Sequence, residues 1–279
     1  MDMRENMFYP QNLHTHTSFC DGDNEAETTV LKALEIGFTS IGFSGHSHCD
    51  YIKSRSSMTP EGTIAYKKEI ARLKNKYAGQ IDIFCGLEFD QYSDDDRLGY
   101  DYIIGANHYL KIGNEFVGFD RNAQTVQEII DRYFGGDGLK FAKEYYRQLA
   151  ELPQYGKFDI VGHFDLISKN CEITQLFDEE DKEYKKYALD CFYALKEKIS
   201  VFEINTGAMA RGYRKTPYPR PFILQEMAKA GVGIILGSDC HNNEFLSYGF
   251  NTAIEFCKAC GVKELQIYTK GGFKSLALV

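Results

Sequence analysis

The stretch NLHTHTSFCDG, residues 12–22, places two histidines and an aspartate within eight positions. His14 and His16 are separated by one residue, and in an extended strand residues i and i+2 project from the same face. Two adjacent imidazoles can hold one metal ion, and Asp21 adds a carboxylate five residues later. Taken alone, the pair could equally be two polar residues on a half-exposed strand. The rest of the chain has to decide between these interpretations.

Histidines and acidic residues recur where short apolar runs end. All seven histidines lie in a strand-like run or just after one: His14, His16, His46, His48, His108, His163 and His241. Glu88, Glu203 and Asp239 follow the same rule. A structural role is the simpler explanation for any one of them alone. Because the carboxyl ends of parallel strands meet at one rim, the whole set together predicts a metal site there.

The chemistry of these side chains indicates which metals they would bind. Nine residues are candidate ligands: His14, His16, Asp21, His46, Glu88, His108, His163, Asp239 and His241. Imidazole and carboxylate ligands suit Zn²⁺, Mn²⁺ or Fe²⁺. Nine ligands are too many for one ion, and a carboxylate such as Glu88 can bridge two, so we expect two or three divalent ions. Such a cluster can activate a water molecule and bind a phosphate group. His48 has no evident partner, and we expect a supporting role for it.

Seven apolar runs alternate with helical segments along the chain. The runs cover residues 12–17, 39–48, 81–90, 100–110, 158–167, 200–207 and 231–241, and the main helical patterns cover 24–38, 59–77, 178–198 and 220–230. A longer helical insertion spans about 120–152, where GGDG at 135–138 predicts a break into two helices. This alternation predicts an α/β fold, a mostly parallel sheet closed into a single-domain barrel over residues 1–279.

Composition limits the possible partners. The formal charge is −8, which argues against binding to nucleic acid or to anionic membranes, because those partners require clustered lysine and arginine. No segment reaches the roughly 18 apolar residues of a membrane span. The opening residues MDMRENMFYPQN contain no apolar core, so we expect no signal peptide and a cytoplasmic protein. The eight cysteines are then expected as reduced thiols, and the CxxC formed by Cys257 and Cys260 as packing on a terminal helix. The sequence leaves the oligomeric state open.

Several motifs together resemble a known family. HTHTSFCDG, SGHSH, GLEFD, GANHYL, GHFDLI, EINTGAMARGYRKTPYP and GSDCH, in this order, resemble the polymerase-and-histidinol-phosphatase (PHP) superfamily, most of all its stand-alone histidinol-phosphate phosphatases. The resemblance implies a distorted (β/α)7 barrel with a trinuclear metal centre. It implies the following ligand groups: His14, His16, Glu88 and Asp239 for the first ion; Glu88, His108 and His163 for the second; Asp21, His46 and His241 for the third. Some relatives have histidine in place of Asp21, whose oxygen favours a harder ion. Asp23 is a competitor that fits the family spacing less well.

The resemblance also implies an activity. Its members hydrolyse the small phosphorylated substrate L-histidinol phosphate to L-histidinol and phosphate in histidine biosynthesis, with a metal-bridging hydroxide as the nucleophile. Arg211, just beyond the sixth strand, is the best candidate for binding the phosphate, ahead of Lys169 and Arg214. We expect Glu203 and Asn205 near the amine and imidazole of histidinol. Asp239 is our candidate for protonating the leaving alcohol.

Three other functions remain possible from the sequence. One is a PHP phosphoesterase that acts on another phosphomonoester, on a nucleotide or on a DNA 3′ end, although the negative charge counts against nucleic acid. A second is a non-catalytic metal-binding module, which would bind ions without turnover. A third is a sugar hydrolase with paired carboxylates, which would not need the histidines.

Overall fold

Seven strands form one sheet in the computed structural model, which describes residues 8–51 and 56–278. Every neighbouring pair in the order β1-β2-β3-β4-β7-β8-β9 is parallel. The strands are β1 (Gln11–Asn12), β2 (Ser40–Phe43), β3 (Asp82–Asp90), β4 (Tyr102–Ala106), β7 (Ile160–Val161), β8 (Val201–Asn205) and β9 (Gly233–Gly237). Each of the seven predicted runs overlaps one of these strands, which confirms the parallel sheet.

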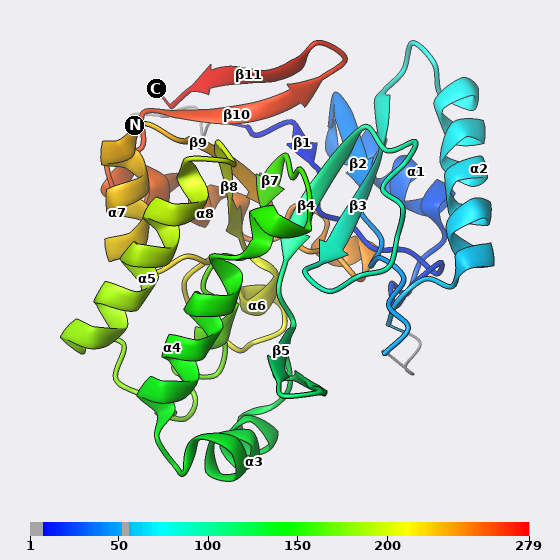
Figure 1. The fold of residues 1–279 in the computed structure, drawn as a ribbon. Coiled ribbons are helices and arrows are strands. Elements are labelled where there is room, and N and C mark those ends of the chain that lie inside the picture. The colour runs from blue at the N-terminus through cyan, green and yellow to red at the C-terminus, as the bar shows by residue number, and fades with distance from the viewer. Residues whose placement is uncertain (1–7, 52–55, 279) are drawn as a thin grey trace.

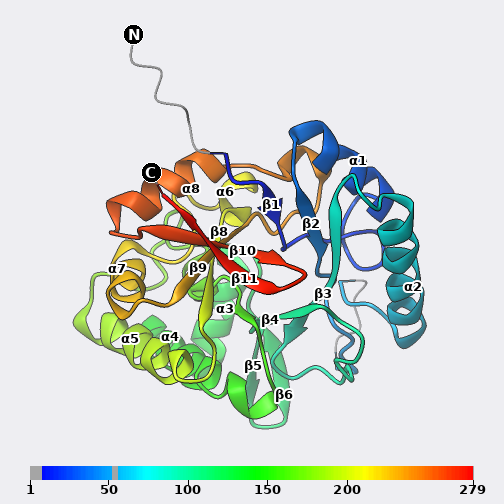
Figure 2. The ribbon, with the colours of Figure 1, turned by 90° about the horizontal axis from the view of Figure 1, so that it is seen from above.

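The sheet closes on itself between its first and last strands. Just beyond β1 and β9, the amide of His16 donates to the carbonyl of Cys240 at 2.8 Å, and the amide of Cys240 donates to the carbonyl of His14 at 3.0 Å. Since β1 and β7 have only two residues each, the ring is irregular. The fold is therefore a distorted (β/α) barrel, as predicted, and Figure 2 shows its strands encircled by helices.

The helices surround the sheet, and capping residues in the sequence mark where they begin. Figure 1 shows α1 and α2 beside β2 and β3, and α4 (Gly138–Leu149), α5 and α7 on the opposite side of the barrel. Their bounds are α1 (Ala26–Ile36), α2 (Pro60–Lys76), α5 (Lys182–Lys196), the short α6 (Gly207–Ala210), α7 (Pro221–Ala230) and α8 (Phe250–Ala259). Helix α2 starts at a Thr59 hydroxyl that accepts from the Gly62 amide at 3.0 Å. It buries Tyr66, Ile70 and Leu73, which share one helical face.

The predicted helical insertion consists of α3 (Ala123–Phe134) and α4 (Gly138–Leu149). Gly135 and Gly136 between them have left-handed φ angles of 65° and 80°, a conformation that glycine adopts without steric cost. The Asp137 carboxylate then caps α4 through the amides of Leu139 and Lys140. The break predicted at 135–138 is therefore present.

Two hairpins were not predicted. The first, β5 (Tyr109–Ile112) with β6 (Glu115–Gly118), shows that the predicted run 100–110 was too long, because the chain leaves the sheet after β4. The second, β10 (Glu264–Thr269) with β11 (Gly272–Ala277), follows α8, so the helix that carries Cys257 is not terminal.

The C-terminal hairpin covers the barrel end at which the strands begin. Gln11 of β1 exchanges two hydrogen bonds with the backbone of Tyr268, at 2.7 and 2.8 Å. Figure 1 shows β10 and β11 lying across this end of the sheet. With this end covered, the carboxyl ends of the strands are where a site can open. Three short 3₁₀ turns, at Leu152–Tyr155, Leu166–Ser168 and Asn243–Phe245, complete the secondary structure of the described residues.

None of the helices in the described part of the chain has both the length and the apolar character needed to span a membrane. The predicted absence of a signal peptide concerns residues that lie largely outside the described part. All eight cysteines are free thiols, and Cys257 is buried in α8.

Candidate metal centre

The carboxyl ends of six sheet strands bring the nine predicted ligands together. Glu88 lies within β3, and the other eight residues follow the ends of strands: His14, His16 and Asp21 after β1, His46 after β2, His108 after β4, His163 after β7, and Asp239 and His241 after β9. The imidazole rings of His14 and His16 have centroids 5.3 Å apart, so the pair does project to one side as predicted.

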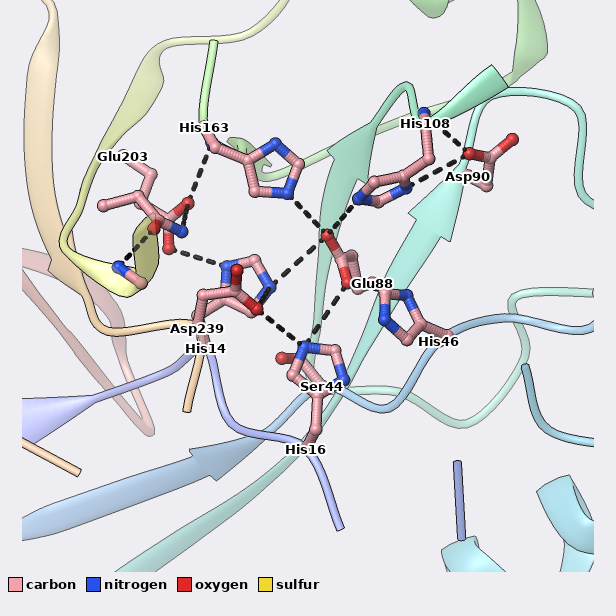
Figure 3. Close-up of polar contacts among 12 residues, drawn as sticks. His14, His16, Ser44, His46, Glu88, Asp90, His108, His163, Glu203 and Asp239 are labelled. Carbon is pink, nitrogen blue, oxygen red and sulfur yellow. Dashed lines mark hydrogen bonds and ion pairs between the residues drawn. The ribbon is translucent and has the colours of Figure 1, made fainter. Parts of the chain in front are cut away.

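Glu88 is at the centre of the cluster and is buried. Its Oε1 atom lies 2.8 Å from Nε2 of His163 and 3.4 Å from Nε2 of both His14 and His108. Its Oε2 atom lies 2.9 Å from Nδ1 of His46 and 3.5 Å from Nε2 of His16. Figure 3 shows the imidazoles converging on this carboxylate. A carboxylate with imidazoles at both oxygens has the geometry to bridge two ions.

Asp239 and Asp21 extend the cluster toward solvent. Oδ1 of Asp239 lies 3.1 Å from Nε2 of His16. Oδ1 of Asp21 lies 3.3 Å from Nε2 of His241 and 3.5 Å from Nε2 of His46. The Asp21 side chain is 34% exposed whereas that of Glu88 is fully buried, so the outer end of the cluster is the one that solvent and a ligand can reach.

These donors form four overlapping groups that could each hold a cation: His16, Asp21, His46 and His241; His14, His16 and Asp239; His14, Glu88 and His163; His46, Glu88 and His108. Nε2 of His14 and Nε2 of His16 are buried and make no hydrogen bond within residues 8–51 and 56–278. A buried polar atom without a partner is costly, and coordination of a divalent ion would satisfy both nitrogens. The residues present therefore fit a cluster of divalent metals.

The carboxylates and imidazoles of the cluster are electrostatically coupled. Burial opposes protonation of His14 and His46, but Glu203 and Glu88 raise the pKa of His14, and Glu88 and Asp21 raise the pKa of His46. A divalent ion would take the place of these protons. Burial and the neighbouring His241 and His46 lower the pKa of His16 to about 3, which keeps the imidazole neutral and able to donate its lone pair. Burial opposes ionisation of Glu88, but His46, His14 and His108 hold its pKa well below the usual range. Glu88 is therefore an anion at the centre of the cluster, where a bridging ligand has to be ionised.

A sequence model of the PHP domain matches residues 12–207. The chain belongs to the PHP domain family. A probable histidinol-phosphatase of Schizosaccharomyces pombe is 25% identical over 289 residues, covering 94% of this chain and 90% of the relative. The histidinol-phosphatase of Bacillus subtilis is 28% identical over 268 residues, covering 88% of this chain and 98% of the relative.

The fold is shared with a solved structure. The histidinol phosphate phosphatase of Lactococcus lactis, crystallised with zinc, L-histidinol and phosphate, superimposes with a TM-score of 0.73 at 20% identity, covering 95% of this chain and 98% of that one. This likeness shows that the PHP chain described here has the same distorted barrel.

Two of the predicted phosphate-binding residues lie at the mouth of the PHP barrel. Nη2 of Arg211 is 2.8 Å from Oδ2 of Asp239, and the Arg211 side chain remains 33% exposed. Nζ of Lys169 is 2.5 Å from Oδ1 of Asp120 and 4.4 Å from the ring centre of Tyr213. Arg211 thus contacts a residue of the cluster, Asp239, directly. Lys169 instead pairs with Asp120, which is not one of the nine predicted ligands.

The other predicted substrate contacts lie elsewhere. Asn205 is buried, and both ends of its side-chain amide have protein partners, since Nδ2 donates to Oε2 of Glu203 at 2.9 Å and Oδ1 accepts from the Gly207 amide at 2.8 Å. Glu203 is also buried, behind His14. Arg214 is buried beside Ser168 and Asp165. The structure therefore gives none of these three an open face toward a substrate.

A cavity of about 170 Å³ beside the cluster contains residues that we did not predict. Its lining includes His46, Asp90, His108, Tyr109, Asp120 and Arg121. Asp90 could have been found, because it lies two positions beyond Glu88 and so on the same face of β3. Asp120 follows the β5–β6 hairpin, which the sequence reading missed.

His48 lies outside the cluster. Its Nδ1 is 3.1 Å from the carbonyl of Met58 and its Nε2 is 2.9 Å from Oδ1 of Asp50. Because both ring nitrogens have protein partners, His48 is a structural residue of the loop after β2.

Proposed function

We propose that this protein is a metal-dependent phosphatase that hydrolyses L-histidinol phosphate to L-histidinol and phosphate. The observation that carries the proposal is the buried Glu88 carboxylate with five imidazoles around it at the mouth of a PHP barrel. The names of the relatives, and the histidinol and phosphate in the Lactococcus lactis structure, support the substrate.

The nine ligands would hold two or three divalent ions in the groups that family resemblance implies. His14, His16, Glu88 and Asp239 form one group, and His108 and His163 complete a second that shares Glu88. Asp21, His46 and His241 form the third. Ions bound there would acidify a water molecule and neutralise the charge of the phosphate.

Arg211 would bind the phosphate at the edge of this cluster. A guanidinium donates two parallel hydrogen bonds to phosphate oxygens and stays charged through the reaction. Its contacts with Asp239 hold it in place before the substrate arrives, and a third of its side chain remains exposed, where an anion could reach it. Arg211 is therefore suited to stabilise the charge that builds on the phosphoryl oxygens in the transition state. Lys169 adds a second positive charge behind Asp120.

Asp239 is better suited to bind metal than to act as a general acid. Burial opposes its ionisation, but Arg211 and His14 hold its pKa well below the usual range. A carboxyl group with a low pKa is ionised and has no proton to give to a leaving alcohol. We therefore keep Asp239 as a ligand and withdraw the acid role.

Histidinol carries an amine and an imidazole, and the cavity beside the cluster has complementary groups. Asp120 and Tyr109 line it and offer a carboxylate and a phenol to these groups. Asp120 offers the carboxylate that we had expected from Glu203, so we assign the contact with the amine of histidinol to Asp120. We assign no substrate contact to Asn205.

The test is a comparison of substrates with the purified, metal-replete protein. Phosphate release is measured from histidinol phosphate and from a panel of nucleotides and simple phosphomonoesters. We expect the highest kcat/KM for histidinol phosphate. A higher value for a nucleotide would contradict the substrate, and bound metal without any phosphate release would favour a binding module.

A further inference from the structure

We propose that Glu203 is a positioning residue that holds two candidate metal ligands, His14 and His163, from behind the cluster. Oε1 of Glu203 lies 2.7 Å from Nδ1 of His14, and Oε2 accepts from the backbone amide of His163 at 2.9 Å. Figure 3 shows the carboxylate placed between the two residues. The inference rests on the metal centre of the proposed function, but not on its substrate.

The contact with His14 crosses a strand of the barrel. Glu203 lies on β8, His14 follows β1, and β9 lies between them in the closed ring. Gly237 at the end of β9 makes this crossing possible, because a Cβ there would lie 1.9 Å from Oε1 of Glu203 and 3.1 Å from Cβ of His14. The glycine therefore leaves the space that the carboxylate occupies.

Glu203 determines which nitrogen of His14 faces the metal centre. An ionised carboxylate only accepts hydrogen bonds, so Nδ1 of His14 must carry the proton. The lone pair is then on Nε2, the buried nitrogen that lies 3.4 Å from Oε1 of Glu88 and lacks a hydrogen-bond partner in the described chain. Carboxylates in this position fix the orientation and tautomer of metal-binding histidines.

The contacts of the second carboxylate oxygen, Oε2, make glutamine a poor replacement for Glu203. Oε2 accepts both from the His163 amide and from Nδ2 of Asn205, each at 2.9 Å. A glutamine at position 203 would have to direct its carbonyl oxygen to these two donors, leaving its NH₂ group against Nδ1 of His14. His14 would then accept at Nδ1 and carry its proton on Nε2, where it could no longer bind a metal ion.

The experiment compares Glu203→Gln, Glu203→Asp and Glu179→Gln with the wild-type chain. Zn²⁺ and Mn²⁺ affinities are measured by competition with a chromophoric chelator, together with circular dichroism and thermal unfolding. Glu179 is a matched control: its side chain is 10% exposed and lies 3.1 Å from Nε of Arg220 rather than from a histidine. We expect Glu203→Gln to weaken the tightest site by about 10- to 100-fold, the usual loss for such partners of metal ligands.

Glu203→Asp keeps the charge, and we expect it to lose less affinity than Glu203→Gln. Glu179→Gln should bind metal like the wild type, even if it unfolds at a lower temperature. Wild-type affinity in a folded Glu203→Gln variant would overturn the inference. If that variant does not fold, wild-type affinity in Glu203→Asp overturns it instead. A wild-type chain that binds no metal would refute the metal centre of the proposed function itself.

Discussion

The guanidinium of Arg211 lies against the candidate metal ligand Asp239, with Nη2 2.8 Å from Oδ2. The two residues are 28 positions apart and follow adjacent strands, β8 and β9. Their pairing puts a permanent positive charge at the edge of the cluster, where Nη1 of Arg211 also lies 3.4 Å from Nδ1 of His241. We therefore propose that a phosphate bound at the ions contacts Arg211.

Arg211→Ala should lower kcat for histidinol phosphate by about 100-fold, the loss typical when one hydrogen-bond donor to a transition-state oxygen is removed. Steady-state kinetics measure the effect, and elemental analysis should find the wild-type metal content. Arg211→Lys keeps the charge but not the paired donors, so we expect partial recovery. Wild-type kcat in the alanine variant would remove Arg211 from the site.

Glu88→Gln should reduce phosphate release by more than about 100-fold, since even partners behind a ligand cost up to that amount. Glutamine has the same shape but no charge, so it cannot hold two cations between the five imidazoles. Elemental analysis should find fewer ions per chain, and circular dichroism should remain that of the wild type. Full metal content and activity would show that Glu88 is not the bridge.

Asp120→Asn should raise KM for histidinol phosphate by about tenfold, equivalent to about 1.4 kcal/mol of binding energy. The reason is the loss of the carboxylate that faces the cavity beside His108. 4-Nitrophenyl phosphate, which has neither amine nor imidazole, serves as the control substrate, and its KM should hardly change. An equal rise in KM for both substrates would mean that Asp120 does not recognise the amine and acts by positioning Lys169 instead.

Thr59→Ala should lower the free energy of unfolding by about 1 kcal/mol, the usual cost of losing a helix N-cap. The Thr59 hydroxyl accepts from the Gly62 amide at the start of α2. The neighbouring Met58 amide donates to the carbonyl of the candidate ligand His46 at 3.1 Å, a backbone contact that the substitution leaves in place. Urea denaturation measures the loss, and phosphatase activity should be unchanged. Thr59→Ser keeps the hydroxyl and should have wild-type stability. If its free energy of unfolding falls as much as that of the alanine variant, the loss of the N-cap is not what destabilises the protein.

Local patterns were sufficient to predict most of the sheet. Apolar runs such as 81–90 and 231–241 became β3 and β9, because buried parallel strands are continuous in hydrophobicity. The hairpins were missed for the opposite reason. Residues 264–277 are half-buried and carry lysine and glutamine between apolar residues, and they are ordered by contacts with Gln11 more than 250 positions away.

The sequence by itself placed the nine predicted ligands at one end of the barrel, because the carboxyl ends of parallel strands meet at a common rim. Only the tertiary structure decided how deep each side chain lies. Glu203 and Asn205 have the same inward direction as Glu88, yet they lie behind the ligands rather than in front of them. Depth depends on how neighbouring strands are staggered around the barrel and on gaps such as Gly237, and neither is a property of one strand's residues.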